Sequence, residues 1–363
     1  MHPSARAHRV YYGLFVIICQ YGGFHTMAAT ILFVSPDPFY RAMWEGLLSD
    51  QGYKLFTTGG AEAAFLACPE LLLDLVVVHI LLPADHGFEV CRRLKADPRN
   101  RLMPVVLLME SPGAEDFSLA RKSGASEVWE QFHTREELLL RMRSILELKS
   151  DLDQQAAEVI ISIARIIESR NPYARGHSER LSNFAVRFGK SLGFREDDLE
   201  VLRLAGLLHD IGNIAIPDAI LFKSGPLNRE DIRVVERHPA EGERICAPFR
   251  SFRHALPIIR YHHERMDGSG YPDGLKGDHI PLIAKIFQVV DICDALTSDR
   301  PQRRGLPLPA ALTVMYEEAE MGWLDPELVS HFASLVIGAD HAMALARSCR
   351  SFPAQTGQWL KHS

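Results

Sequence analysis

The first 150 residues alternate between short apolar runs and longer amphipathic segments. Strand-like runs occur at TILFV (30–34), KLFTT (54–58), LVVVHILLP (75–83) and PVVLLM (104–109), and a segment of helical character follows each of them. Strands that alternate with helices at this spacing are typical of a doubly wound parallel sheet. Residues 28–147 are therefore predicted to form an α/β domain.

A stretch with few helix breakers joins the two halves of the chain and runs up to Asn171-Pro172. Its apolar positions recur every three to four residues, as in a helix. They are Leu148, Leu152, Ala156, Val159 and Ile163. The pattern predicts a helix that leaves the first domain, and that either pairs with its copy in a dimer or packs as core.

Bulk composition fits a two-domain globular protein. The chain has 363 residues, 24% charged and 9% aromatic, which is ordinary for such proteins. The net charge is −6 and no block of Lys or Arg stands out, which argues against binding along a nucleic-acid backbone. The six cysteines lack CxxC spacing, which suits a reducing cytosol and predicts a cytoplasmic protein.

The two ends of the chain are expected to lie outside both domains. Arg6 and Arg9 precede an uncharged, largely apolar run from Val10 to Phe24 that superficially resembles a signal peptide. The run is too short for an ordinary spanning helix, and Met27 directly precedes the first strand. We interpret residues 1–27 as an extension from a misassigned start, with a membrane-associated segment as second choice, and residues 346–363 as a tail.

Potential metal ligands recur along the second half of the chain at spacings that fit one buried site. They are His177, His209, Asp210, His238, His262, His263 and Asp291. Imidazole and carboxylate suit divalent Fe, Mn or Zn, and seven ligands are too many for one ion. A lone His is more often a core or surface residue, but burying the adjacent His209 and Asp210 without partners costs several kcal/mol. The pattern predicts a two-metal site, of a kind that commonly cleaves phosphate esters.

Four long segments carry a resemblance to the HD-GYP family of HD phosphohydrolases. They read RLAGLLHDIGNIAIPDAILFKSGPL, RHPAEGERI, YHHERMDGSGYPDGLKGDHIPL and AKIFQVVDICDALTSDRP. The resemblance covers about residues 150–340 and implies an all-helical domain, expected over 148–345, that hydrolyses cyclic di-GMP to pGpG. It assigns His177, His209, Asp210 and Asp291 to one metal, and His238, His262 and His263 to the second, with Asp210 bridging both.

The expected cofactors are two divalent ions, Fe or Mn first, with Zn and Ni as alternatives. Two such ions neutralise the phosphodiester and lower the pKa of a shared water, whose hydroxide can attack phosphorus. Asp210 would fix the spacing of the metals. Glu264 or Asp267 could orient the ligating histidines.

Further positions are expected to contact the substrate. Arg180 lies three residues after His177, on the same helix face, and could clamp a phosphate. By the resemblance, Tyr271 of the Gly-Tyr-Pro loop approaches the phosphate, and Arg300 and Arg303 match basic positions near the ligand phosphates. The alternative for these two arginines is a solvated basic patch.

Three positions depart from the family pattern. Asn213 stands where most members have Lys; it can donate a hydrogen bond but cannot neutralise a phosphate, so activity is expected to be reduced. Tyr173 replaces a Glu that trinuclear relatives use as a ligand, which predicts two metals and pGpG as the product. The usual RPY triplet ends in Gln302. Asp210, Asn213 and Tyr271 remain the candidate catalytic residues, and Asn213 is also a candidate substrate contact.

The segment DLVVVHILLPADHGFEVCRRL resembles the receiver domain of response regulators. His79 stands where a receiver has its phosphoacceptor aspartate, so the resemblance is to a domain without its chemistry. The other substitutions are Ser35-Pro36 for the acidic pair, leaving Asp37 nearby, Met109 for Thr or Ser, and Glu130 or Gln131 for Lys. Residues 28–147 are therefore predicted to be a pseudo-receiver that serves dimerisation or docks a signalling partner.

Three functions stay open from the sequence. The first is an active cyclic di-GMP phosphodiesterase, favoured by the intact ligand set and Tyr271. The second is a catalytically weak HD-GYP module that senses cyclic di-GMP and signals through the pseudo-receiver, which Asn213 supports. The third is a phosphodiesterase for another cyclic dinucleotide such as cyclic GMP-AMP. A homodimer is expected by analogy with the family.

Overall fold

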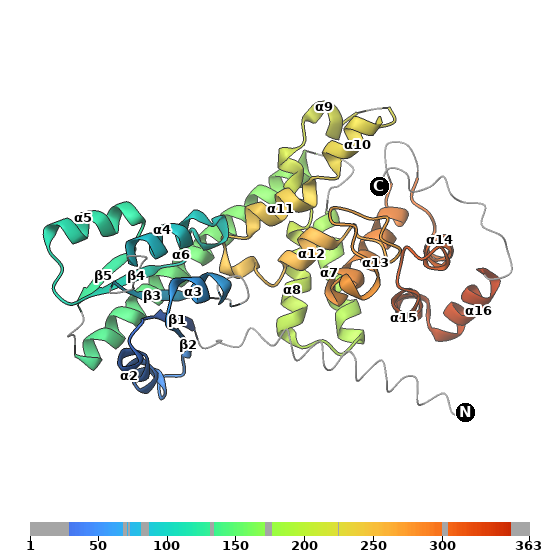
Figure 1. Ribbon diagram of the computed structural model, residues 1–363. Helices are drawn as coiled ribbons and strands as arrows, with labels where there is room; N and C mark the ends of the chain where they lie inside the picture. Colours follow the sequence, from blue (N-terminus) through green and yellow to red (C-terminus); the bar gives the residue numbers. More distant parts are fainter. Residues whose placement is uncertain are drawn as a thin grey trace. The chain divides into compact units, whose positions relative to one another are not determined.

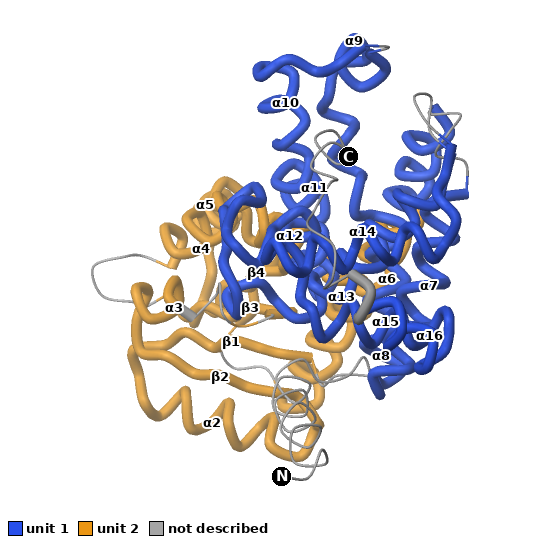
Figure 2. The backbone as a smooth tube through the Cα atoms, turned by 90° about the vertical axis from the view of Figure 1, so that its right-hand side faces the viewer, with its two compact units in different colours: residues 1–25, 159–246, 252–363 blue, residues 26–158, 247–251 orange. Residues whose placement is uncertain are grey.

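The computed structural model describes residues 29–67, 71, 73–80, 87–130, 134–170, 176–223, 225–299 and 304–349. These residues form two compact units (Figure 2). The first unit contains the described residues up to Glu158 together with Ala247–Ser251, and the second contains the described residues of 159–246 and 252–349. The contact-based boundary therefore lies eleven residues beyond the predicted one at 147/148.

The first unit is built on a parallel five-stranded sheet in the order β2-β1-β3-β4-β5 (Figure 1). The strands are β1 (Thr30–Val34), β2 (Lys54–Thr58), β3 (Leu75–His79), β4 (Val105–Met109) and β5 (Glu127–Glu130). This strand order is that of the flavodoxin-like doubly wound fold. The prediction of a doubly wound α/β domain is confirmed.

Helices cover both faces of this sheet. They are α2 (Pro38–Leu48), α3 (Ala61–Ala67), α4 (Gly87–Ala96), α5 (Ala114–Ser123) and the start of α6 (Arg135–Ser169), with a short η1 (Pro98–Asn100). Alternate residues of β1 face opposite sides. Leu32 and Val34 pack with α3, α4 and α5, whereas Ile31 and Phe33 pack with α2 and α6.

The second unit is helical in all of its described elements, which confirms the predicted all-α domain. Its α-helices are α7 (His177–Ser191), α8 (Glu196–Leu208), α9 (Asp218–Leu221), α10 (Arg229–Val235), α11 (His238–Cys246), α12 (Leu256–Tyr261), α13 (Leu282–Thr297), α14 (Leu308–Glu320), α15 (Pro326–Ile337) and α16 (Ala339–Cys349). Its short 3-10 turns are η2 (Ile211–Ala215) and η4 (Gly277–His279), and η3 (Arg250–Phe252) lies where the chain returns from Ala247–Ser251 of the first unit. Helix α13 is apolar on nearly all sides and buried from Ala284 to Val290, so it is the central helix of this unit.

Two glycines allow the motif segments to approach each other. A Cβ on Gly212, in η2, would lie 1.9 Å from the carbonyl oxygen of His238 at the start of α11. A Cβ on Gly270 would lie 2.5 Å from the carbonyl oxygen of His263. Glycine is therefore required where the first His-Asp doublet meets α11, and where the Gly-Tyr-Pro loop folds back on the His-His doublet.

Some expectations fall on residues outside the described ranges. These are the N-terminal extension, the tail beyond residue 349, Tyr173 and the segment 300–303 with Arg300 and Arg303. Within the described ranges, none of the helices combines the length and the apolar character needed to cross a membrane.

Candidate metal centre

The seven predicted metal ligands sit mostly at helix ends. His177 and His238 are the first residues of α7 and α11, and His209 directly follows α8. Asp210 follows His209, and His262 and His263 follow the last turn of α12. Asp291 lies in the central helix α13. These positions bring residues from several helices together.

The structure gathers these residues into two groups. Asp210, His238, His262 and His263 form one group, and His177, His209 and Asp291 form the other; within each group the ligand atoms all lie within 4.8 Å of one another. Asp210 faces both, because its Oδ1 lies 3.2 Å from Nε2 of His238 and its Oδ2 lies 3.5 Å from Nε2 of His209. One carboxylate oxygen toward each group is the arrangement that a bridging ligand requires.

Hydrogen bonds orient the histidine rings. The Nδ1 atoms of His209, His238 and His262 lie 3.3, 2.9 and 3.0 Å from backbone carbonyl oxygens of the preceding helical turn. A carbonyl oxygen only accepts, so Nδ1 carries the proton and donates it. The Nε2 lone pair is left free, and metal-ligating histidines commonly have this arrangement.

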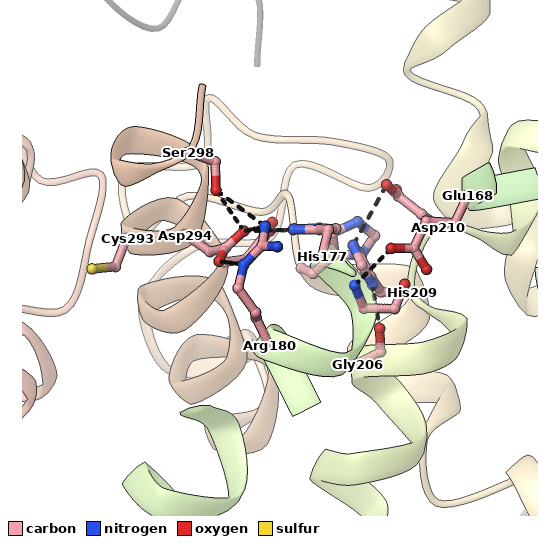
Figure 3. Close-up of polar contacts among 12 residues, drawn as sticks. Glu168, His177, Arg180, Gly206, His209, Asp210, Cys293, Asp294 and Ser298 are labelled. Carbon is pink, nitrogen blue, oxygen red and sulfur yellow. Dashed lines mark hydrogen bonds and ion pairs between the residues drawn. The ribbon is translucent and has the colours of Figure 1, made fainter. Parts of the chain in front are cut away.

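His177 is oriented by a carboxylate (Figure 3). Its Nδ1 lies 2.6 Å from Oδ2 of Asp294, which is one turn after Asp291 on α13. Arg180 donates from Nε to Oδ1 of Asp294 at 3.0 Å and from Nη2 to Oγ of Ser298 at 3.2 Å. Arg180 was expected to clamp a substrate phosphate, but in the structure it is paired with Asp294. The sequence reading missed Asp294, although its i+3 spacing from Asp291 placed it on the same helix face.

The electrostatics of the two groups favour a bound cation. Burial lowers the pKa values of His262 and His263 well below the ordinary range, and neighbouring histidines add to it: His209 and His238 for His262, and His262 and His238 for His263. Burial opposes the ionisation of Asp210, yet His209 and His238 hold its pKa well below its usual value. His262 and His263 are therefore neutral and Asp210 is ionised at neutral pH, which are the protonation states that a divalent metal needs.

The Gly-Tyr-Pro loop lies over the first of these groups. The ring of Tyr271 stacks on that of His263 with centroids 4.8 Å apart, and it lies 6.3 Å from the ring of His238. Burial, and then the charge of Asp210, raises the pKa of Tyr271. Its hydroxyl therefore stays protonated and can donate a hydrogen bond beside the predicted metal ligands.

Two acidic residues have a different role from the one suggested by the sequence. Glu264 does not orient a histidine: its buried carboxylate accepts the backbone N–H groups of Asp273 and Leu275 at 2.7 and 2.8 Å. Asp267 accepts the N–H of Ser269 at 2.8 Å and shapes the same loop. Both carboxylates therefore hold the segment that carries Tyr271.

A hollow opens beside the predicted ligands. It is lined in part by His177, Asp210, Asn213 and Glu168. The half-buried Asn213 thus lies where a substrate contact was expected. Glu168, which the sequence reading did not single out, lies in the last turn of α6 and accepts the N–H of Ser178 at 3.2 Å, so it caps the first turn of α7.

The receiver-like unit places its substituted residues at the carboxyl ends of the strands. His79 ends β3, is 1% exposed, and has its Nδ1 3.0 Å from Oγ of Ser35. Asp37 accepts the N–H of Phe39 and caps α2. Met109 ends β4 and Glu130 ends β5. These described positions provide no acidic pair of the kind that holds magnesium in a receiver.

Comparison with known proteins places the chain among metal-dependent hydrolases. Residues 162–328 match the family profile described as the HD domain. Over 329 residues the chain is 31% identical to the cyclic di-GMP phosphodiesterase response regulator RpfG of Xanthomonas campestris pv. campestris, covering 84% of this chain and 86% of the relative. The chain belongs to the HD-GYP family.

Other HD-GYP relatives differ in the substrate that their names state. The 3'3'-cGAMP-specific phosphodiesterase 3 of Vibrio cholerae is 37% identical over 177 residues, which are 48% of this chain and 38% of the relative.

The solved receiver domain of an HD domain-containing protein from Pseudomonas fluorescens Pf-5 is similar over 37% of this chain and 97% of that domain, with 22% identity and a TM-score of 0.34. The receiver-like fold assigned to residues 29–130 rests on the strand order of the unit itself.

Proposed function

We propose that this HD-GYP protein is a metal-dependent phosphodiesterase that hydrolyses cyclic di-GMP to pGpG. The position of Asp210 between the two ligand groups carries the proposal, because two-metal phosphodiester chemistry needs a shared ligand at that point. The long alignment with a relative named as a cyclic di-GMP phosphodiesterase supports the choice of substrate.

The donor set fits two divalent ions, with Fe or Mn as the proposed metals. His177, His209 and Asp291 would hold one ion, and His238, His262 and His263 the other, with Asp210 shared. When bound, such ions neutralise the phosphodiester and supply an activated water. The imidazoles suit Fe, Mn, Ni or Zn, so metal supply also decides which ion binds.

The residues around this centre would bind and orient the substrate. The protonated hydroxyl of Tyr271 would donate a hydrogen bond to a phosphate oxygen beside His263. The amide of Asn213, on the wall of the hollow that His177 and Asp210 also line, would donate a second one. Asn213 provides no positive charge, so the substrate is expected to be held less tightly here than in members that have Lys.

The experiment measures hydrolysis of cyclic di-GMP by anaerobically purified full-length protein loaded with Fe(II) or Mn(II), with the products separated by chromatography. We expect pGpG to accumulate. Asp210→Ala should abolish turnover and metal loading together, because both ligand groups lose their shared carboxylate. Near-normal turnover in that variant would refute the site. Metal-loaded protein that binds cyclic di-GMP without turnover would instead support a sensor module.

A second candidate substrate can be tested in the same assay. The 37% identity to a 3'3'-cGAMP-specific phosphodiesterase covers about half of the chain. We propose cyclic GMP-AMP as the alternative substrate. Initial rates on the two dinucleotides at equal concentration would rank them, and a faster rate on cyclic GMP-AMP would displace cyclic di-GMP.

The receiver-like unit is proposed to regulate this activity without being phosphorylated. Its His79 is buried and hydrogen-bonded to Ser35. Regulation would then act through dimerisation or a docked signalling protein. A homodimer and a cytoplasmic location stay predictions, and light scattering on the full chain tests the first of them.

A further inference from the structure

His177 differs in its hydrogen bonding from the other oriented histidines of the centre. His209, His238 and His262 donate from Nδ1 to backbone carbonyl groups, which are neutral. His177 meets the carboxylate of Asp294 at 2.6 Å. The side chain of Asp294 is 5% exposed and lies between the ring of His177 and the guanidinium of Arg180 (Figure 3).

We propose that Asp294 and Arg180 are positioning residues for the metal ligand His177, with Arg180 acting through Asp294 and not on the substrate phosphate. The inference rests on the metal centre described under the proposed function and deepens it. It gives His177 a charged partner at Nδ1, where His209, His238 and His262 have neutral backbone carbonyl groups.

The contacts of Asp294 explain why it tolerates burial. A buried carboxylate is destabilising unless its oxygens are compensated by hydrogen bonds or opposite charge. Oδ1 accepts from Nε of Arg180 at 3.0 Å, and Oδ2 meets His177, with Nη2 of Arg180 and Oγ of Ser298 each 3.3 Å away. The carboxylate is thus satisfied on both oxygens and held in one orientation.

That fixed carboxylate would control how His177 binds a metal. Its bond to Nδ1 selects the tautomer with a free Nε2, and Nε2 lies 3.8 Å from Oδ1 of Asp291 in the same ligand group. A carboxylate partner also makes the imidazole a stronger donor to a metal. Asp291 and Asp294 lie one turn apart on α13, so this helix supplies one ligand directly and positions a second.

The same contacts leave Arg180 poorly placed to clamp a phosphate. A guanidinium grips a phosphate best with two parallel N–H groups. Nε and Nη2 of Arg180 form such a pair, and both already face Asp294. Nη2 also donates to Ser298. A phosphate would have to displace the buried carboxylate to use this edge.

The test is a Mn(II) titration of the full-length protein, followed by electron paramagnetic resonance and elemental analysis, without substrate. Wild type is expected to bind two equivalents. Asp294→Asn should weaken one equivalent by about 10- to 100-fold, the usual effect of losing such a partner, and His177→Ala marks the complete loss of that equivalent. Arg180→Gln should weaken the same equivalent by less. Arg187→Gln is the matched control, because Arg187 is an exposed arginine on the same helix.

Two results would overturn the inference. One is wild-type affinity for both equivalents in Asp294→Asn. The other is an Arg180→Gln variant that binds both metals normally but has a raised KM for cyclic di-GMP, which is the behaviour of a phosphate clamp. If thermal melting shows that Asp294→Asn does not fold, Arg180→Gln decides alone. Two bound metals without hydrolysis would refute the proposed function and leave this inference intact.

Discussion

At the scale of residues, the hydrogen-bond partner of each side chain in the candidate metal centre sets its orientation. Three of the predicted histidine ligands use backbone carbonyl oxygens three residues earlier in the chain, and His177 uses Asp294. Glu264 and Asp267 hold the loop that carries Tyr271. At this scale the residue types alone could not separate ligands from supporting carboxylates, since Asp291 and Asp294 are chemically identical.

Restoring the missing positive charge at position 213 should raise activity. Asn213 is half-buried on the wall of the hollow beside His177 and Asp210. Asn213→Lys is expected to raise kcat/KM for cyclic di-GMP roughly tenfold, which corresponds to about 1.4 kcal/mol of added stabilisation. The change in kcat/KM is measured by steady-state kinetics at fixed metal loading, with Asn213→Gln as the uncharged control. An unchanged or lower rate would mean that the charge does not limit catalysis.

The histidine cluster should make the metal-free protein sensitive to acid. Burial holds the pKa values of His262 and His263 below the usual 6.5, so below that pH the unfolded chain binds more protons and stability falls. His177 opposes this: burial alone would lower its pKa, but Asp294, Asp291 and Asp210 together raise it. On acidification, His262 and His263 destabilise the fold and His177 stabilises it. We therefore expect the metal-free protein to have a lower melting temperature at pH 5 than at pH 7.

A single-site variant isolates the contribution of this cluster. His263→Gln removes one of the groups that burial keeps neutral, so its melting temperature should depend less on pH between 7 and 5. Both proteins are measured after chelation and dialysis. An equal or steeper dependence in the variant would contradict the assignment of the acid sensitivity to this pair.

At the scale of elements, the apolar pattern of the first unit predicted four of the five strands, but it missed helix α5 (Ala114–Ser123) and the edge strand β5. Strand β5 (Glu127–Glu130) was not predicted, because it is four residues long and begins and ends with Glu. Its Trp129 is fully buried between the sheet and α6. Register with β4 and the packing of Trp129 stabilise the strand, and neither is visible in a four-residue pattern.

Helix α14 contains a buried carboxyl group that should weaken the fold at neutral and higher pH. Burial raises the pKa of Glu318 from 4.5 to about 7, which corresponds to a penalty of roughly 3 kcal/mol. The unfolded chain ionises first, so the penalty grows as the pH rises from 4.5 and is complete above 7. Glu318→Gln should therefore raise the melting temperature more at pH 8 than at pH 5.

The exposed Glu320 of the same helix provides the control for this variant. Glu320→Gln removes a charge from α14 without removing the buried carboxyl, so its effect on melting should be small at both pH values. Destabilisation by Glu318→Gln at pH 8 would show that the ionised carboxylate has a compensating partner.

At the scale of the whole molecule, one chain carries a receiver-like unit and an HD domain. The long alignment with RpfG spans both units. Helix α6 runs from Arg135 to Ser169 and contributes residues to both. Its predicted apolar positions lie on one continuous helix, and Leu148, Leu152 and Val159 are exposed on it. That these residues pair with their copies in a dimer stays a prediction.

The receiver-like unit should not accept a phosphoryl group from a small donor. His79 is 1% exposed and hydrogen-bonded to Ser35, and Asp37 is used to cap α2. Incubation with acetyl phosphate and magnesium should leave the intact mass unchanged, while an ordinary receiver domain treated in parallel gains one phosphoryl group. A stable adduct mapped to residues 29–130 would refute the prediction of a pseudo-receiver.

The sequence by itself determined the fold classes and the candidate ligand set, because both leave a periodic or literal record in the residues. Strand and helix periods fixed the α/β unit, and the ordered His and Asp doublets indicated a two-metal site. The tertiary structure decided which carboxylates support the ligands, and it paired Arg180 with Asp294. Those pairings join α7 to α13 across more than a hundred residues, so packing decides them and local pattern does not.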